Sequence, residues 1–117
     1  MPARTMLFLD DEHVANAVRL SRVWEQPRPF GPVLAADRPW EGACVVRPNV
    51  IANPDGAGYR MWYQVFTRRK TPGSRLFCYA QSDDGVTGIK PELGLVEWRG
   101  SRADNIVLGG RDPGWAL

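Results

Sequence analysis

The residue pair of this sequence best suited to carbohydrate chemistry is Trp40 with Glu41. An indole ring can stack on the apolar face of a pyranose or furanose, while a neighbouring carboxylate binds sugar hydroxyl groups. The alternative is structural, with Trp40 covering the core from a loop and Glu41 solvated. Asp10 and Asp11 follow the apolar run Met6–Leu9. They too have two interpretations, as residues of a site or as the polar end of a strand.

Other kinds of site find little support in the sequence. His13 is the only histidine, which nearly excludes a histidine-rich metal site. The two cysteines, Cys44 and Cys78, lack the CxxC spacing of a zinc site, and we expect two buried thiols rather than a disulfide. The sequence contains no phosphate-binding loop and no dinucleotide fingerprint. We therefore expect neither a metal nor a cofactor.

The elements that position the candidate residues must be short. The 12 glycines and 10 prolines are scattered over 117 residues, which disfavours long helices. The turn signal Asn53–Gly58 separates two apolar runs and predicts the clearest β-hairpin of the chain. A second tight turn is predicted at Ser82–Gly85, held by its Asp side chains, and a basic hairpin tip at Thr67–Ser74.

The whole pattern predicts an all-β protein. The predicted strands are Met6–Leu9, Val14–Trp24, Ala43–Ala52, Tyr59–Phe66, Leu76–Gln81, Leu93–Trp98 and Asn105–Leu108. For Val14–Trp24 a helix is the alternative, and its alternating pattern favours the strand. About seven short strands, with turn signals roughly every 8–12 residues, are typical of all-β folds. No helical pattern alternates with them, so a βαβ arrangement is disfavoured.

Several stretches follow one another in a characteristic order. They are Arg38–Gly42, Arg47–Ile51, Asn53–Gly58, Tyr59–Tyr63, Cys78–Gly85, Lys90–Glu97 and Asn105–Leu108. Together this ordered set resembles the first part of the five-bladed β-propeller glycoside hydrolases, the superfamily of invertase, levanase and arabinanase. The resemblance implies that residues 1–117 form a partial propeller, the first one to two blades, each an antiparallel four-stranded sheet.

The resemblance also implies a carbohydrate-active protein, the N-terminal part of a propeller that hydrolyses or binds glycosidic substrates. In such relatives the nucleophile is the Asp of an Asn-Asp-Pro-Asn stretch, whereas here Arg47 precedes Pro48 and Asn49. An Arg cannot attack an anomeric carbon, but it can hydrogen-bond sugar hydroxyls. Glu41 is the nearest replacement carboxylate, so we expect it to be catalytic. The substrate-binding residues expected beside it are Trp40, Arg47 and Asn49.

The sequence departs from the resembled pattern in ways that leave other functions open. The relatives usually carry a Trp three residues after the glycine of the Ser82–Gly85 turn, where this chain has Gly88. Arg47 favours a different class of function, a non-catalytic β-sheet module that binds carbohydrate or assembles with other chains. A truncated, inactive fragment is the third possibility. Fewer than two blades would leave sheet edges open, so we also expect self-association through those edges.

The net charge and the hydropathy of the sequence limit the kinds of partner that we expect. Fifteen basic and 13 acidic residues give a net charge of +2, which disfavours binding to nucleic acid. No apolar run approaches the roughly 18 residues that a membrane span needs. The N-terminal stretch lacks the pattern of a secretory signal, so we expect a cytoplasmic protein with a carbohydrate partner.

Overall fold

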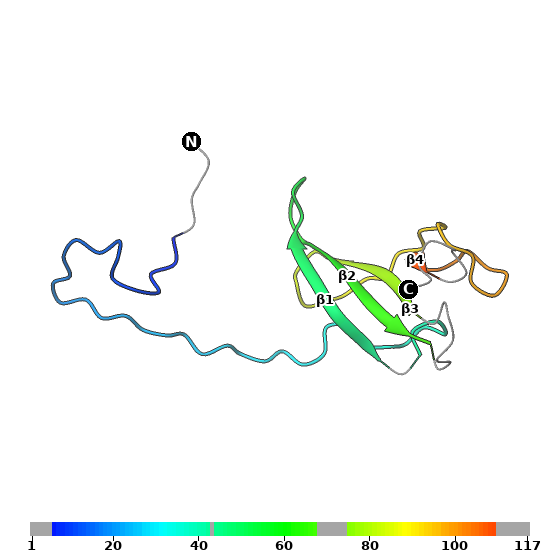
Figure 1. Cartoon of the computed structure of the whole chain (residues 1–117), viewed down its shortest axis with the longest axis horizontal. Helices are drawn as coiled ribbons and strands as arrows, with labels where there is room; N and C mark the ends of the chain where they lie inside the picture. The colour runs from blue at the N-terminus through cyan, green and yellow to red at the C-terminus, as the bar shows by residue number, and fades with distance from the viewer. Residues whose placement is uncertain (1–5, 43, 68–74, 110–117) are drawn as a thin grey trace.

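The computed structural model describes residues 6–42, 44–67 and 75–109. The strands of these residues form a single antiparallel sheet (Figure 1). The four strands are β1 (Val45–Ala52), β2 (Tyr59–Phe66), β3 (Arg75–Ser82) and β4 (Ile106–Gly109). They lie side by side in chain order. The described residues include no helix long and apolar enough to cross a membrane. The all-β prediction is confirmed, as one four-stranded sheet.

The hairpin of β1 and β2 forms where the sequence predicts it. At the turn, the Asn53 amide donates to the Gly58 carbonyl at 2.9 Å, and the Asp55 amide donates to the Asn53 side chain at 3.2 Å. The register of the two strands is interrupted between Val46 and Asn49. Arg47 lies in this bulge with a φ of 50°, a left-handed backbone conformation that residues other than glycine rarely adopt. The bulge therefore divides β1 into two short halves.

The strand register gives the sheet two unlike faces, because successive side chains point to opposite sides. We call one the core face, since the buried apolar side chains of the strands lie on it. Its buried apolar residues are Tyr63, Val65, Leu76, Cys78, Ala80 and Ile106. Leu34, Trp40, Val96 and Trp98, which lie outside the strands, pack against this cluster. The core therefore lies between the sheet and a cover of irregular segments.

We call the other side the open face, because none of its residues is fully buried. The register and the alternation of the strands place on it Val46, Asn49, Ile51, Arg60, Trp62, Gln64, Phe66, Arg75, Phe77, Tyr79, Gln81 and Leu108. All are exposed or half-buried. This face is the accessible surface of the sheet.

Residues 6–32 form an extended arm that leads away from the sheet (Figure 1). The predicted strands Met6–Leu9 and Val14–Trp24 are both wrong, since these residues form no strand and nearly all are exposed. A strand needs a neighbouring strand to satisfy its backbone, and neither segment has one. Arg19, with a φ of 55°, also interrupts any extended course through the second segment.

The predicted strand Leu93–Trp98 is wrong as well. Its backbone turns at Gly94, which has a φ of 68°, and its only bridge is an isolated pair between Trp98 and Ser101. The segment instead covers the core face irregularly, with the Leu93 amide donating to the Asp104 carbonyl at 2.8 Å. The described residues thus form four strands, not about seven. The predicted basic tip at Thr67–Ser74 lies, apart from its first residue, outside the described residues.

The turn at Ser82–Gly85 is held by Asp84, as predicted. Its Oδ1 atom accepts hydrogen bonds from the backbone amides of Val86 and Thr87, at 2.8 and 2.7 Å. These donors, together with the Ser82 hydroxyl, hold the pKa of the Asp84 carboxyl well below its usual range. The other acidic residue of this turn, Asp83, is exposed and lines an open hollow described below.

Replacing Gly58 by Ala is expected to destabilise the hairpin by about 2 kcal/mol, because Gly58 has a φ of 96° and an added Cβ would lie 2.5 Å from the Ser82 carbonyl oxygen. Gly56→Ala, in the same turn, is the matched control, since nothing lies within 4 Å of its added Cβ. Urea unfolding followed by circular dichroism measures both variants. Equal stability of the two variants would contradict the turn geometry.

Candidate functional site

Glu41, the expected catalytic residue, is completely buried. Its Oε1 atom accepts a hydrogen bond from the Tyr63 hydroxyl at 2.7 Å. Its Oε2 atom accepts from the Lys90 ammonium at 2.7 Å, and from the backbone amides of Asp37 and Arg38 at 2.9 Å each. Both oxygens are therefore occupied, by one hydroxyl, one cation and two amides. The interpretation of Glu41 as a solvated loop residue is wrong.

Lys90 neutralises this buried carboxylate. Its side chain is 5% exposed, and its ammonium donates to Glu41, to the Asp37 carboxylate at 2.6 Å and to the Ala35 carbonyl at 2.6 Å. An ammonium has three protons, so these three acceptors satisfy it. The hydrogen bond from Lys90 lowers the pKa of the Asp37 carboxyl. Lys90 thus ties the loop that carries Glu41 to a segment 49 residues further along the chain.

Trp40 belongs to the same assembly. Its Nε1 donates to the Asn105 side-chain oxygen at 2.9 Å, and the Asn105 amide donates in turn to the Tyr63 hydroxyl at 2.7 Å. The Trp40 ring packs edge-on against Trp98, with ring centroids 6.0 Å apart. We call Trp40, Glu41, Tyr63, Lys90 and Asn105 the buried network. Within it Trp40 covers the core, as the structural interpretation of the pair predicts.

Tyr63 is held as a hydrogen-bond donor at the centre of the buried network. Burial, together with the neighbouring Glu41 carboxylate, raises the pKa of the Tyr63 phenol far above its ordinary value. The phenol therefore stays protonated, donating to Glu41 while it accepts from Asn105. The network is consequently fixed in one pattern of donors and acceptors.

The buried network is suited to holding the fold rather than to acting on a substrate. A general acid or nucleophile must come within hydrogen-bond reach of the glycosidic oxygen or the anomeric carbon. Glu41 has no exposed surface, and a sugar could touch it only if Lys90 and residues 37–38 first moved away. Its catalytic role stays a prediction, whereas its role as a clamp follows directly from its contacts.

The two other expected site residues lie elsewhere. Asn49 pairs with Trp62 in the strand register and belongs to the open face, not to the buried network. Arg47 is exposed in the bulge of β1. The structure therefore connects Trp40 to Glu41 through Asn105 and Tyr63. It places Asn49 on the open face, away from Trp40 and Glu41.

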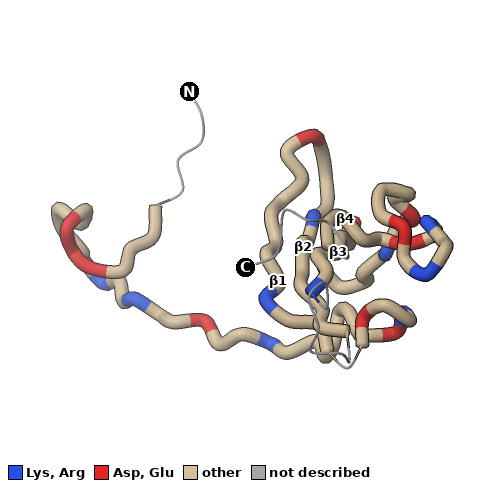
Figure 2. The backbone as a smooth tube through the Cα atoms, turned by 45° about the vertical axis from the view of Figure 1, so that its right-hand side comes forward, with Lys and Arg blue, Asp and Glu red and all other residues tan. Residues whose placement is uncertain are grey.

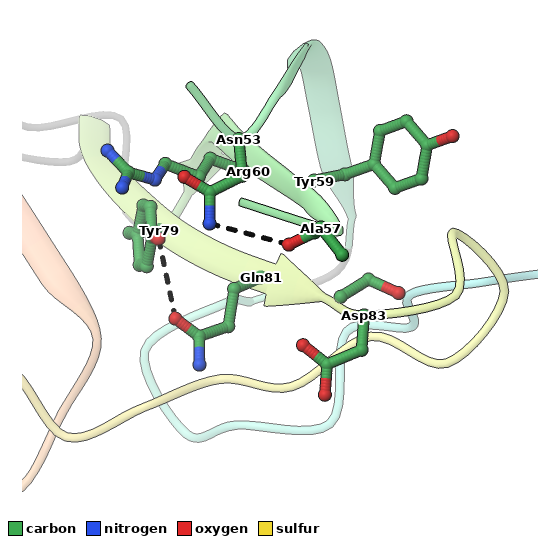
Figure 3. A pocket seen from close by; sticks show the side chains of 8 residues that line it. Asn53, Ala57, Tyr59, Arg60, Tyr79, Gln81 and Asp83 are labelled. Atoms are coloured by element: carbon green, nitrogen blue, oxygen red, sulfur yellow. Dashed lines mark hydrogen bonds between the residues drawn. The ribbon is translucent and has the colours of Figure 1, made fainter. Parts of the chain in front are cut away.

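The open face carries a second candidate site that the sequence analysis did not identify. An open hollow of about 170 Å³ lies where this face meets the β1–β2 turn (Figure 3). Its lining residues are Asn53, Ala57, Tyr59, Arg60, Tyr79, Gln81, Ser82 and Asp83. The Tyr79 ring, which lines the hollow, meets the Trp62 ring edge-on at 5.4 Å between centroids.

Polar side chains surround this aromatic pair. The Arg60 guanidinium lies 3.0 Å from the Asp55 carboxylate, and the Tyr79 hydroxyl donates to Gln81 over 3.4 Å (Figure 3). The signal for this site was present in the sequence. Arg60 and Trp62 are spaced two apart on one strand, as are Tyr79 and Gln81 on the next, and such spacing places each pair on one face.

The cysteines are both free thiols, and they differ in environment. Cys78 is buried as predicted, but Cys44 is exposed, so the expectation of two buried thiols is half wrong. Burial, with the nearby Glu41 charge, raises the pKa of the Cys78 thiol to about 12. Within the described part of the chain, no three His, Cys, Asp or Glu side chains are grouped closely enough to share a metal ion.

Comparison with known proteins returns no match to any family model, curated protein or solved structure. A sheet of four antiparallel strands in chain order occurs in many β folds, so the sheet alone assigns no function. The function therefore has to be argued from the chemistry of the two candidate sites.

Replacing Lys90 by Met is expected to destabilise the protein by about 3–5 kcal/mol, because the Glu41 carboxylate would be left buried without a counter-ion. The double variant Glu41→Gln with Lys90→Met should recover part of this loss, since no buried charge remains. Urea unfolding gives the free energies of unfolding.

The control is Arg22→Met, which breaks the exposed ion pair of Arg22 with Asp11. It should change stability by less than about 1 kcal/mol. A Lys90→Met variant as stable as this control would show that the Glu41–Lys90 pair does not hold the fold.

Thiol labelling at pH 8 is expected to modify one cysteine per chain rapidly. Cys44 is exposed, while Cys78 is buried with a pKa of about 12 and stays in its unreactive protonated form. A chromogenic disulfide reagent counts the thiols, with and without denaturant. The Cys44→Ser variant should lose the rapid phase and keep the slow one; rapid labelling of that variant would contradict the burial of Cys78.

Proposed function

We propose that this chain binds carbohydrate without hydrolysing it, at the hollow on the open face of the sheet. The observation that carries the proposal is the Tyr79 ring, which lines the hollow together with Arg60 and Gln81 and meets the Trp62 ring edge-on. Aromatic rings stack on the apolar faces of sugars, and amide and guanidinium groups hydrogen-bond their hydroxyls.

The polar contacts at the hollow are of a kind that a sugar can replace. The hydrogen bond from Tyr79 to Gln81 is long, at 3.4 Å, and both groups lie at the surface of the hollow. A sugar hydroxyl placed between them would make two shorter bonds in its place. Arg60 is already oriented by Asp55, so little side-chain freedom is lost when it donates to a ligand.

Binding is better supported than hydrolysis because the hollow lacks a pair of acids. Most glycosidases need two carboxyl groups, about 5–5.5 Å apart for retention and about 6.5–9.5 Å apart for inversion. Asp83 is the only carboxylate that lines the hollow. Glu41, the expected catalytic acid, is enclosed by the buried network on the other side of the sheet.

A second candidate function is that of one blade in a glycoside hydrolase-like β-propeller. It is favoured by the sheet itself, since four antiparallel strands in chain order are the architecture of a propeller blade. In this proposal Glu41 is one of two acids, the second is supplied by another blade, and opening of the buried network exposes the carboxylate. The aromatic hollow would then hold a neighbouring unit of the same polysaccharide.

Tyr79→Ala and Arg60→Ala are each expected to weaken carbohydrate binding by about tenfold, which corresponds to about 1.4 kcal/mol of lost stacking or hydrogen bonding. A levan and a linear arabinan are suitable probes, given the superfamily that the sequence resembles, and isothermal titration calorimetry measures their affinities. Arg75→Ala is the matched control, because Arg75 is also an arginine of the open face but contacts Phe66 at the other end of the strands.

Two results would contradict the binding proposal. One is that neither the levan nor the arabinan gives a measurable heat of binding. The other is an equal loss of affinity in the Arg60→Ala and Arg75→Ala variants. A reducing-sugar assay on the same samples tests the second candidate. Hydrolysis that is abolished by Glu41→Gln, in a variant that stays folded, would support the hydrolase blade and assign the acid to Glu41.

A further inference from the structure

We propose that the arm of one copy of this chain adds as an edge strand to β1 of a second copy, and that the two copies exchange arms reciprocally. The inference concerns assembly and does not depend on the carbohydrate site. It rests on an unpaired sheet edge, on the residue pattern of the arm and on the exposure of its apolar side chains.

The free edge is the outer side of β1. Among the described residues, β1 has a single neighbouring strand, β2, so its other side has no strand partner. Pro48 and the bulge at Arg47 obstruct the first half of this edge, because Pro has no amide hydrogen and a bulge turns the strand away. The second half, Asn49–Ala52, is regular and exposed. An incoming strand therefore has a short and defined place to pair.

The arm contains a segment that fits such an edge. Val18, Leu20 and Trp24 are spaced by even numbers of residues, so they lie on one side of the segment when it is extended. Their exposed fractions are 69%, 79% and 66%. Arg19 has a φ of 55° and must become extended for this pairing. Arg22 lies on the same side as these three residues, so that side of the extended segment is apolar except for one arginine.

The partner edge also offers apolar contacts on both sides of the sheet. Val50 belongs to the core face and Ile51 to the open face, yet they are 55% and 45% exposed. An added strand beside β1 would cover both, since each side chain next to an edge gains a neighbour from the new strand. The exposed apolar residues of the arm and of β1 would be buried together.

A second copy is a better source of the edge than the same chain. The hydrogen bonds that the arm makes in the structure are local, such as those from Arg22 to the Asp10 carbonyl and the Asp11 carboxylate. Charged residues of both signs lie along the arm, which extends away from its own sheet (Figure 2). Each copy supplies one arm and accepts one, so the exchange at the β1 edges closes as a twofold dimer, while the outer edge of β4 takes no part in it.

Sedimentation equilibrium of the full chain over a concentration series tests the proposal, with hydrogen exchange of residues 18–24 measured on the same samples. We expect a dimer, with protection of these amides that rises with concentration. The double variant Leu20→Asp with Trp24→Asp should weaken the dimer by at least about tenfold. Its control, Ser21→Asp with Val23→Asp, adds the same charge to the other side of the segment and should change dimerisation less than about threefold.

Three results would overturn the proposal: a monomer at every concentration, protection of residues 18–24 in a monomer, or equal weakening of the dimer by the two double variants. Protection in a monomer would mean that the arm pairs with its own sheet. The Tyr79→Ala variant should keep the mass of the wild-type protein, so that failure of carbohydrate binding and failure of arm exchange give separate results.

Discussion

The fold depends on one buried carboxylate. A charge without compensation costs several kcal/mol to bury, so Glu41 can lie inside this protein only while its partners surround it. Those partners come from three parts of the chain: the loop before β1, strand β2, and the segment that contains Lys90. Satisfying Glu41 therefore fixes the cover of the core face in position. The next residue, Gly42, has a φ of 63° and forms an isolated β-bridge with Phe66 of β2, so the backbone beside Glu41 is held against the sheet.

The clamp also determines which surface is available for function. The sequence most strongly suggests the pair Trp40 and Glu41 for sugar chemistry, and the clamp buries Glu41 completely and half-buries Trp40 on the core side. The opposite face keeps its aromatic side chains half-buried beside polar groups. The same residue types thus occur on both sides of the sheet, in a closed structural arrangement on one and an open one on the other. Burial, rather than residue type, separates their roles.

Local interactions explain what could be predicted from the sequence. The Asn53–Gly58 turn and the Ser82–Gly85 turn are closed by residues only two to five positions apart, so their signals lie within one short stretch. The side-chain partners of Glu41, Tyr63 and Lys90, lie 22 and 49 residues away, and no spacing rule connects them to it. The apolar run Met6–Leu9 has the composition of a strand, but composition cannot supply the neighbouring strand that would pair with it. The hollow at Tyr79 depends on the pairing of β2 with β3 beside the β1–β2 turn, and the sequence analysis predicted these strands but not their register.

Gly88 links the arm to the clamp. An added Cβ at this position would lie 2.8 Å from the Leu34 side chain and 2.9 Å from the Val33 carbonyl oxygen. The space beside Gly88 is taken by residues 33 and 34, at the root of the arm. Lys90, two residues later, holds the Ala35 carbonyl at 2.6 Å. The arm therefore begins at residues 33–35, which are held in place, and only the residues before them could pair with a second copy. A larger side chain at position 88 would displace Leu34 and with it the origin of the arm, so a residue without a side chain at this position is part of what fixes the arm's starting point.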